Sequence, residues 1–224
     1  MKKIKASITA VGSFLPEKIL NNADLEKIVD TNDDWITTRT GIKERRILDK
    51  GIGTSYMAIR AANTIIKNKK LDPTQIDLVI VATITPDMHA TATAAYVASE
   101  IGASNAFGFD ISAACSGFLY GLSTASAFIE SGRYKKIILI GADKMSSIVD
   151  YTDRNTCIIF GDGAGAVLLE PNIEGYGVQD EYLRSNGSNR DLLRIEAGGS
   201  QTPTTKDTVE EKKHFIYQDG KNVF

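Results

Sequence analysis

The stretch DLVIVAT at residues 77–83 has the pattern of a strand that is buried on both faces of a sheet. A second run, KIILIG at residues 136–141, has the same continuous apolar character. Strands of this kind belong to parallel sheets, whose two faces are covered by helices. These two stretches therefore predict the fold class, a mostly parallel α/β sheet.

Helical patterns alternate with the predicted strands. Residues 54–67 carry an apolar stripe of helical period, and residues 94–101 form a second helical segment before a strand at 106–111. Residues 115–131 form a long, almost uncharged helix that ends just before Gly132. Because apolar and small residues occur on every side of this helix, we expect all of its sides to be buried. The alternation predicts right-handed crossovers between parallel strands.

The flanking segments complete the expected order of elements. We predict, in chain order, a strand at 4–11 ended by Gly12, a short helix starting near Asn21 or Asn22, strands at 156–160 and 164–170 around a tight turn at 161–163, a strand-like stretch at 172–187, a mobile loop at 200–213, and the start of a further element at 220–224.

The composition of the 224 residues excludes several classes of protein. With 42% hydrophobic and 24% charged residues, the chain can bury a core and is not disordered. A formal net charge of −2 provides no basic field for nucleic acid. No apolar run is long enough to span a membrane, and the N-terminus lacks the pattern of a secretory signal. Two cysteines and two histidines, scattered along the chain, predict neither a disulfide framework nor a metal site, so we expect a cytoplasmic protein.

Cys115 is the strongest candidate for a catalytic side chain. It follows a predicted strand and the small residues 112–114, and it opens the long helix. Unpaired N–H groups and the positive dipole end at a helix N-terminus favour the nucleophilic thiolate. The alternative is a small buried core residue. For Cys157, in the middle of a predicted strand, the core interpretation is preferred.

A second candidate region is WITTRTGIKERR at residues 35–46. Trp and Arg side chains can enclose an adenine ring, and Arg or Lys can bind phosphates, which suits a nucleotide-bearing substrate such as coenzyme A. The alternative is an exposed loop with a partly packed Trp35. His89 is expected in a surface loop, and His214, beside Lys212 and Lys213, is expected to be solvated.

Four ordered motifs together resemble the β-ketoacyl-acyl-carrier-protein synthase III family of the thiolase superfamily. They are TNDDWITTRTGIKERR (31–46), ATITPD (82–87), FDISAACSGF (109–118) and DRNTCIIFGDGAGA (153–166). The resemblance implies a layered α/β/α/β/α thiolase-like fold with an incomplete second half. It assigns residues 1–171 to the N-terminal half, which carries the nucleophile, and residues 172–224 to the beginning of the C-terminal half.

The resemblance also implies an activity. Such enzymes are acyltransferases that move an acyl group from acyl-CoA to the active-site Cys, here Cys115. They then condense it with malonyl-acyl-carrier protein, with decarboxylation, to initiate type II fatty acid synthesis. The backbone N–H of Cys115 would contribute to an oxyanion hole. A homodimer is implied, with an interface near the helix and strand around Cys115. No metal or tightly bound cofactor is implied.

By their positions in these motifs, further residues are implied to bind coenzyme A. Trp35 and Arg154 would flank the adenine of coenzyme A, and Thr31 and Arg39 would contact its nucleotide. Gly220 would lie beside the pantetheine arm.

The sequence departs from the family pattern in two respects. Thr91 stands where many members have a Phe that closes the acyl pocket from the dimer partner, so we expect a pocket open to longer or branched primers. The family's catalytic His and Asn come from a C-terminal part that nothing here matches. We therefore expect this polypeptide by itself to be a truncated product or one part of a divided enzyme, unable to complete condensation. The alternatives are a starter-unit acyltransferase of polyketide assembly and a non-catalytic CoA-binding or dimerisation half.

Overall fold

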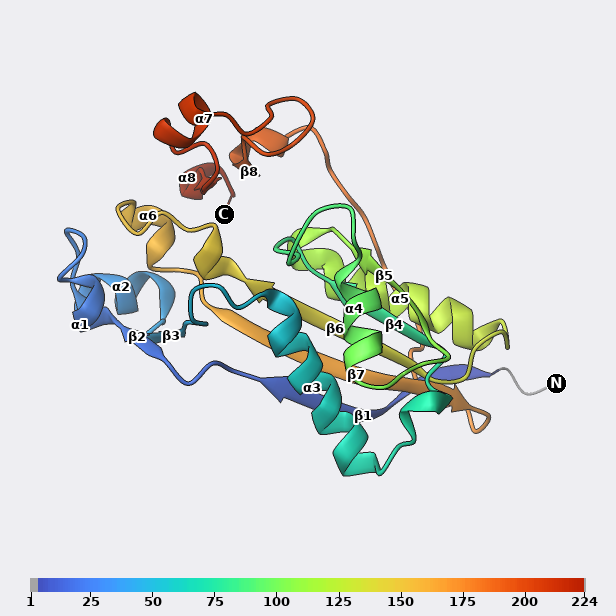
Figure 1. Ribbon diagram of the computed structural model, residues 1–224. Helices are drawn as coiled ribbons and strands as arrows, with labels where there is room; N and C mark the ends of the chain where they lie inside the picture. The colour runs from blue at the N-terminus through green and yellow to red at the C-terminus, as the bar shows by residue number, and fades with distance from the viewer. Residues whose placement is uncertain (1–3, 224) are drawn as a thin grey trace. The chain divides into compact units, whose positions relative to one another are not determined.

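The computed structural model describes residues 4–223, and the chain divides into two compact units (Figure 1). The sheet unit comprises the N-terminal segment through Pro16 together with Asp49–Asp143 and Gly163–Leu183. The second unit comprises Glu17–Leu48, Lys144–Asp162 and the segment from Arg184 onward. The division at residue 171 expected from the family resemblance stays a prediction.

A five-stranded sheet with the order β1-β7-β6-β4-β5 forms the centre of the sheet unit. Its strands are β1 (Lys5–Phe14), β4 (Leu78–Ala82), β5 (Phe107–Ile111), β6 (Ile137–Lys144) and β7 (Asp162–Asn172). β4 is parallel to both of its neighbours, β5 and β6, and β1 is antiparallel to β7. Every residue of β4 is buried, as its continuous apolar run predicts.

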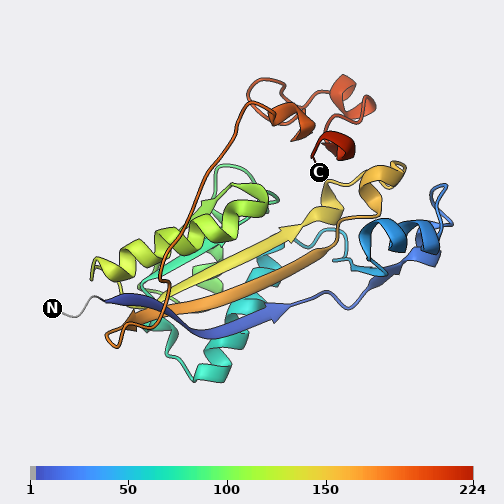
Figure 2. The same ribbon diagram turned by 180° about the vertical axis from the view of Figure 1, so that it is seen from behind.

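Helices cover both faces of this sheet, as expected. α3 (Thr54–Lys69) and α4 (Thr93–Glu100) lie on one face and α5 (Gly117–Glu130) lies on the other (Figure 2). On the α5 side, Ala125 and Ile129 belong to one buried cluster with alternate residues of β4 and β6. A 3-10 turn, η1 (Pro73–Gln75), precedes β4.

The burial of α5 differs from the prediction. Its buried residues are small except for Ile129, and Gly121 lets the helix approach the sheet because a Cβ there would lie 2.4 Å from Leu139 Cδ1. The outer face is only partly covered by the described residues: Leu119 is 55% exposed, and Ala127 is exposed. The sequence of this helix predicts burial on every side. The structure buries one side only.

Gly12 does not end the first strand, contrary to the prediction. β1 continues through Gly12 to Phe14, and Gly12 pairs with Ala166 of β7. The glycine is needed for packing: a Cβ at this position would lie 2.1 Å from the carbonyl oxygen of Ala61 in α3. The missing side chain thus allows α3 to lie directly on β1.

The second unit is built from short elements. The strand β2 (Ile19–Asn21) pairs antiparallel with β3 (Glu44–Arg46), and β8 (Leu193–Ile195) pairs antiparallel with β9 (Ile216–Gln218). Its helices and 3-10 turns are α1 (Asn22–Leu25), α2 (Asp33–Thr40), η3 (Met145–Ser147), α6 (Arg154–Cys157), η4 (Arg190–Leu192), α7 (Lys206–Glu210) and α8 (Gly220–Val223). Asn21 caps α1 as predicted. Within residues 4–223, no helix has the length and hydrophobicity of a membrane span.

Three predicted elements of the later chain were wrong. The strand expected at 156–160 is replaced by α6, because the Asp153 carboxylate accepts from the Asn155 N–H and caps a helical turn. The turn expected at 161–163 is absent, since β7 already begins at Asp162. Residues 173–187 contain no strand.

The loop expected at 200–213 contains α7, where Thr205 and Thr208 form a reciprocal cap. At the end of the described chain α8 begins at Gly220, where the start of an element was expected; Phe224 lies outside the described residues.

The contact between Gly12 and α3 generates a test. In the full-length protein, Gly12→Ala should reduce the free energy of unfolding by about 1–3 kcal/mol, because the clash is with backbone rather than with a flexible side chain. Gly165→Ala in β7 is the control, since no heavy atom lies within 4 Å of its added Cβ, and its effect should stay within about 0.5 kcal/mol. Equal urea midpoints for the two variants would contradict this assignment.

Candidate active site and nucleotide pocket

Cys115 lies in a 3-10 turn, η2 (Ala114–Ser116), between the end of β5 and the start of α5, and it is exposed. The preceding Ala114 has a φ of +45°, in the left-handed region that alanine seldom adopts. Gly117 opens α5 against β4, where a Cβ would lie 3.2 Å from the Ala82 side chain. The small residues on both sides of the thiol thus allow a sharp strand-to-helix turn that presents Cys115 outward.

Two carboxylates hold the backbone near this turn. Asp143, in β6, accepts hydrogen bonds from the Thr83 hydroxyl (2.9 Å), the Ile84 N–H (2.9 Å) and the Thr85 hydroxyl (3.0 Å) just after β4. Asp110, in β5, accepts from the Thr93 and Ala94 N–H groups in the first turn of α4 (2.7 and 2.8 Å). The segment between β4 and α4 is therefore fixed at both ends.

This segment carries Thr91, the residue expected at the acyl pocket. Thr91 is exposed and lies two residues before the first residue of α4. Its side chain is small, and the Asp110 carboxylate anchors the helix that follows it. His89, in the same segment, is exposed as expected.

The second unit contains a cavity of about 750 Å³ built from three segments of the chain. α2 contributes Trp35 and Arg39, and the segment that follows α6 contributes apolar side chains. β9 and the start of α8 contribute the third wall, which includes Gly220. The full lining consists of Trp35, Arg39, Asn155, Ile158, Ile159, Tyr217, Gln218, Asp219, Gly220 and Lys221. Trp35 and Arg39, expected at the nucleotide, and Gly220, expected beside the pantetheine arm, thus lie around one cavity.

The guanidinium groups of two arginines lie close to the Trp35 ring. The Cζ atom of Arg39 lies 4.7 Å from the centroid of the Trp35 ring, and the Cζ atom of Arg154 lies 5.0 Å from it. Arg154 is held in place by a 3.0 Å hydrogen bond from Nη1 to the Asp30 carbonyl. An aromatic surface flanked by two guanidinium groups suits a purine that carries phosphates.

Thr31, also expected at the nucleotide, is not among the residues that line the cavity around Trp35. Its hydroxyl is buried, and among the described residues it has no hydrogen-bond partner. The following residue, Asn32, caps α2 by accepting from the Trp35 N–H at 2.8 Å. Thr31 therefore stands directly before the helix that carries Trp35 and Arg39.

Cys157 has the opposite environment to Cys115. It is fully buried at the end of α6, and burial raises the pKa of its thiol to about 11. The core interpretation is therefore correct, although the element is a helix. His214 differs from its expected solvated state, because its Nδ1 is buried without a partner in the described chain, and its ring lies 4.0 Å from that of Phe215.

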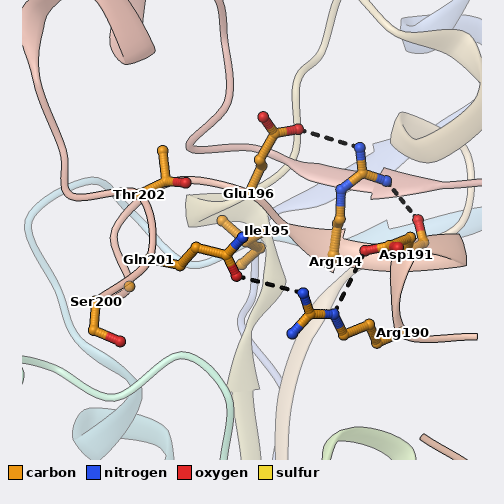
Figure 3. A pocket seen from close by; sticks show the side chains of 9 residues that line it. Arg190, Asp191, Arg194, Ile195, Glu196, Ser200, Gln201 and Thr202 are labelled. Atoms are coloured by element: carbon orange, nitrogen blue, oxygen red, sulfur yellow. Dashed lines mark hydrogen bonds and ion pairs between the residues drawn. The ribbon is translucent and has the colours of Figure 1, made fainter. Parts of the chain in front are cut away.

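Sequence reasoning did not identify a second cavity in this unit, of about 730 Å³ (Figure 3). Arg190 and Arg194 face it, but their guanidinium groups contact the chain's own acceptors. Arg194 pairs with Glu196 at 3.1 Å, and Arg190 reaches Gln201 at 3.4 Å. These contacts make it the weaker ligand site. Across residues 4–223, no group of three potential metal-binding side chains occurs.

Comparison with known proteins decides the family. The model of the 3-oxoacyl-[acyl-carrier-protein] synthase III family matches residues 109–187. The β-ketoacyl-[acyl-carrier-protein] synthase III 2 of Bacteroides thetaiotaomicron is 54% identical over 225 aligned residues, covering 100% of this chain and 67% of that protein. The chain belongs to the β-ketoacyl-acyl-carrier-protein synthase III family. It spans about two thirds of the length of this relative.

Solved structures confirm the fold of this synthase III chain. The 3-oxoacyl-[acyl-carrier-protein] synthase III of Aquifex aeolicus is 40% identical, with a TM-score of 0.81, covering 97% of this chain and 66% of that one. The priming β-ketosynthase of the R1128 polyketide pathway is 32% identical, with a TM-score of 0.86 and coverages of 97% and 64%. The thiolase-like α/β fold and the acyltransferase class expected from the motifs are thereby confirmed, and fatty acid synthesis is better supported than polyketide assembly.

The two cysteines of this synthase III chain should differ sharply in reactivity. In the native full-length enzyme at pH 7.5, iodoacetamide should modify Cys115 and leave Cys157 unmodified. Cys115 is exposed, whereas Cys157 is buried, with a pKa of about 11 that keeps it protonated. Peptide mapping by mass spectrometry measures both sites, and labelling in urea is the control for an accessible Cys157. Equal native labelling rates at pH 7.5 would contradict the prediction.

Proposed function

We propose that Cys115 accepts the acyl group of an acyl-CoA and that the enzyme containing this chain condenses it with malonyl-acyl-carrier protein. The observation that carries the proposal is the exposed thiol on the turn between β5 and α5, in a chain of the synthase III family. The product is the β-ketoacyl-acyl-carrier protein that begins a fatty acid.

The first half-reaction is a transfer between two thioesters. The Cys115 thiolate attacks the carbonyl carbon of the acyl-CoA, and the resulting oxyanion is stabilised by backbone N–H groups at the turn, including that of Cys115. Collapse of this intermediate breaks the bond to the CoA sulfur. The products are an acyl-Cys115 thioester and free coenzyme A, so no oxidant, metal or redox cofactor takes part.

The second half-reaction forms the new carbon–carbon bond. Loss of carbon dioxide from the malonyl group leaves an enolate, whose carbon attacks the acyl-Cys115 carbonyl. The Cys115 thiolate is released as leaving group, which restores the enzyme. In the family this step uses a His and an Asn, so its catalysis is proposed for the whole enzyme.

The nucleotide of the acyl-CoA binds at the cavity around Trp35. In the proposed complex the adenine stacks on the Trp35 ring in place of a guanidinium group. Arg154 packs on the opposite face of the adenine. Arg39 meets the phosphates, and Gly220 leaves room for the pantetheine arm. Thr31 contacts the nucleotide after a local movement that uncovers its buried hydroxyl. Arg39 and Arg154 have their Cζ atoms 4.7 and 5.0 Å from the Trp35 ring centroid, so a guanidinium must move outward to admit the adenine and then lies close enough to contact it.

The proposed assembly is a homodimer in the cytoplasm. β5 is an edge strand of the sheet, and its first residue, Phe107, is 42% exposed. In α5, which follows β5 in the chain, Leu119 is 55% exposed. An exposed strand edge with adjoining apolar side chains favours pairing with a second copy. A reactive Cys115 thiol also requires a reducing compartment.

Acetylation of Cys115 tests the proposed function. Incubation of the full-length enzyme with acetyl-CoA should add one acetyl group, which peptide mapping should locate on Cys115. Cys115→Ala should abolish the addition, whereas Cys157→Ala, which removes the buried thiol, should retain it. Binding of coenzyme A without acetyl transfer would instead favour a non-catalytic CoA-binding half, and a preference for polyketide carrier proteins would favour the starter-unit alternative.

The small side chain of Thr91 should widen the range of primers. In the wild-type enzyme, acetylation and acylation by isobutyryl-CoA should both proceed. Thr91→Phe should lower kcat/KM for isobutyryl-CoA by about tenfold or more relative to acetyl-CoA, because the larger ring fills the pocket. Thr91→Ser is the control and should leave the ratio unchanged. A wild-type enzyme that accepts only acetyl-CoA would contradict this proposal.

A further inference from the structure

We infer that Arg45 is a positioning residue that sets the spacing of the two walls of the nucleotide pocket; the inference rests on the proposed function. Arg45 lies in β3 and does not line the cavity. It is 3% exposed, an unusual environment for a guanidinium group. Its contacts join the helix that carries Trp35 and Arg39 to the segment that carries Arg154.

One side of the guanidinium holds the segment of α6. Arg45 Nε donates to the Ile158 carbonyl at 3.0 Å, and Nη2 donates to the same oxygen. Ile158 directly follows α6, the helix that begins with Arg154, and the Ile158 side chain lines the cavity. A carbonyl at the end of a helix has no partner within the helix, so the guanidinium satisfies it.

The other side of the guanidinium holds α2 through one intermediate. Arg45 Nη1 donates to the Asn22 side-chain oxygen, and Asn22 is 2% exposed. The Asn22 amide then donates to the Asp33 carboxylate at 2.6 Å, in the first turn of α2, and to the Ile42 carbonyl at 3.0 Å beyond its end. The hydrogen bond from Asn22 lowers the pKa of Asp33, which keeps this acceptor charged.

The chemistry of arginine is specifically suited to this role. Its planar group donates in two directions at once, whereas a lysine ammonium at the same place is a single nitrogen and cannot hold both acceptors in the same geometry. Space is also restricted, since a Cβ at Gly161 would lie 3.2 Å from the Arg45 Cβ. A change at Arg45 therefore alters the separation of Trp35 and Arg154 without removing any group that touches the nucleotide.

The test compares two acyl donors in the full-length enzyme. Acetyl-CoA carries the nucleotide, and acetyl-pantetheine lacks it. Arg45→Lys should raise KM for acetyl-CoA by about tenfold or more, with kcat within about twofold, and should leave kcat/KM for acetyl-pantetheine unchanged. Arg46→Lys, the same substitution at the next residue of β3, should behave as wild type with both donors.

A second measurement reports on the pocket directly. Trp35 is the single tryptophan of this chain, so its fluorescence follows coenzyme A binding. Arg45→Lys should raise the Kd of coenzyme A by about tenfold. Asn22→Ala, which breaks only the contacts to α2, should also raise this Kd. These two variants keep the test available if a larger substitution at Arg45 prevents folding.

The possible results separate the inference from the proposed function. Equal losses with acetyl-CoA and acetyl-pantetheine would make Arg45 a general structural residue, and unchanged kinetics would remove its role altogether; either result overturns the inference. A wild-type enzyme that does not acetylate Cys115, or that uses acetyl-pantetheine as well as acetyl-CoA, would overturn the proposed function itself.

Discussion

The buried strand β4 is the constraint on which the sheet unit depends. Both of its neighbours run parallel to it, so the carboxyl ends of three strands lie at the same end of the sheet. The chain must leave each of these strand ends through a loop. Asp143 and Asp110 supply the acceptors that fix the two ends of one of these loops, the one that leads from β4 to α4. The turn that carries Cys115 leaves from the same end of the sheet, so its position follows from the sheet.

Carboxylates serve the same purpose in the second unit. Asp162, at the start of β7, is buried and accepts from the Leu48 N–H at 2.7 Å and from the Ser146 N–H at 2.8 Å. A charged acceptor that satisfies two or three donors organises irregular backbone without a regular ladder. The segments that carry the nucleotide pocket are short, so such side-chain contacts, rather than long helices, define their conformation.

The sequence predicted the parts of the fold that depend on continuous apolar patterns. The strands β4 and β6 and the helix α3 follow directly from such runs. The strand expected at 156–160 failed because a local cap at Asp153 competes with the strand preference of the apolar residues behind it. Likewise, Gly12 looked like a strand end, since nothing in the local sequence indicates a helix backbone against it.

The candidate site was predicted to a similar extent. Cys115, Trp35, Arg39 and Gly220 were candidates from the motifs, whereas Tyr217, in the same wall of the cavity as Gly220, was not, because its place there depends on how β9 pairs with β8. Arg45 was also missed. It sits in a charged run, where an exposed side chain is the ordinary expectation, and only its contacts with Asn22 and Ile158 distinguish it.

The contact between Gly12 and Ala61 has a consequence for how this family can diverge. Most crowded positions in a protein core can exchange volume with a neighbour, so that one enlarged side chain is compensated by a smaller one opposite. Here the opposing atom is a backbone oxygen, which every amino acid carries. A smaller side chain at residue 61 therefore cannot make room, and replacement of Gly12 requires the backbone of β1 or of α3 to shift.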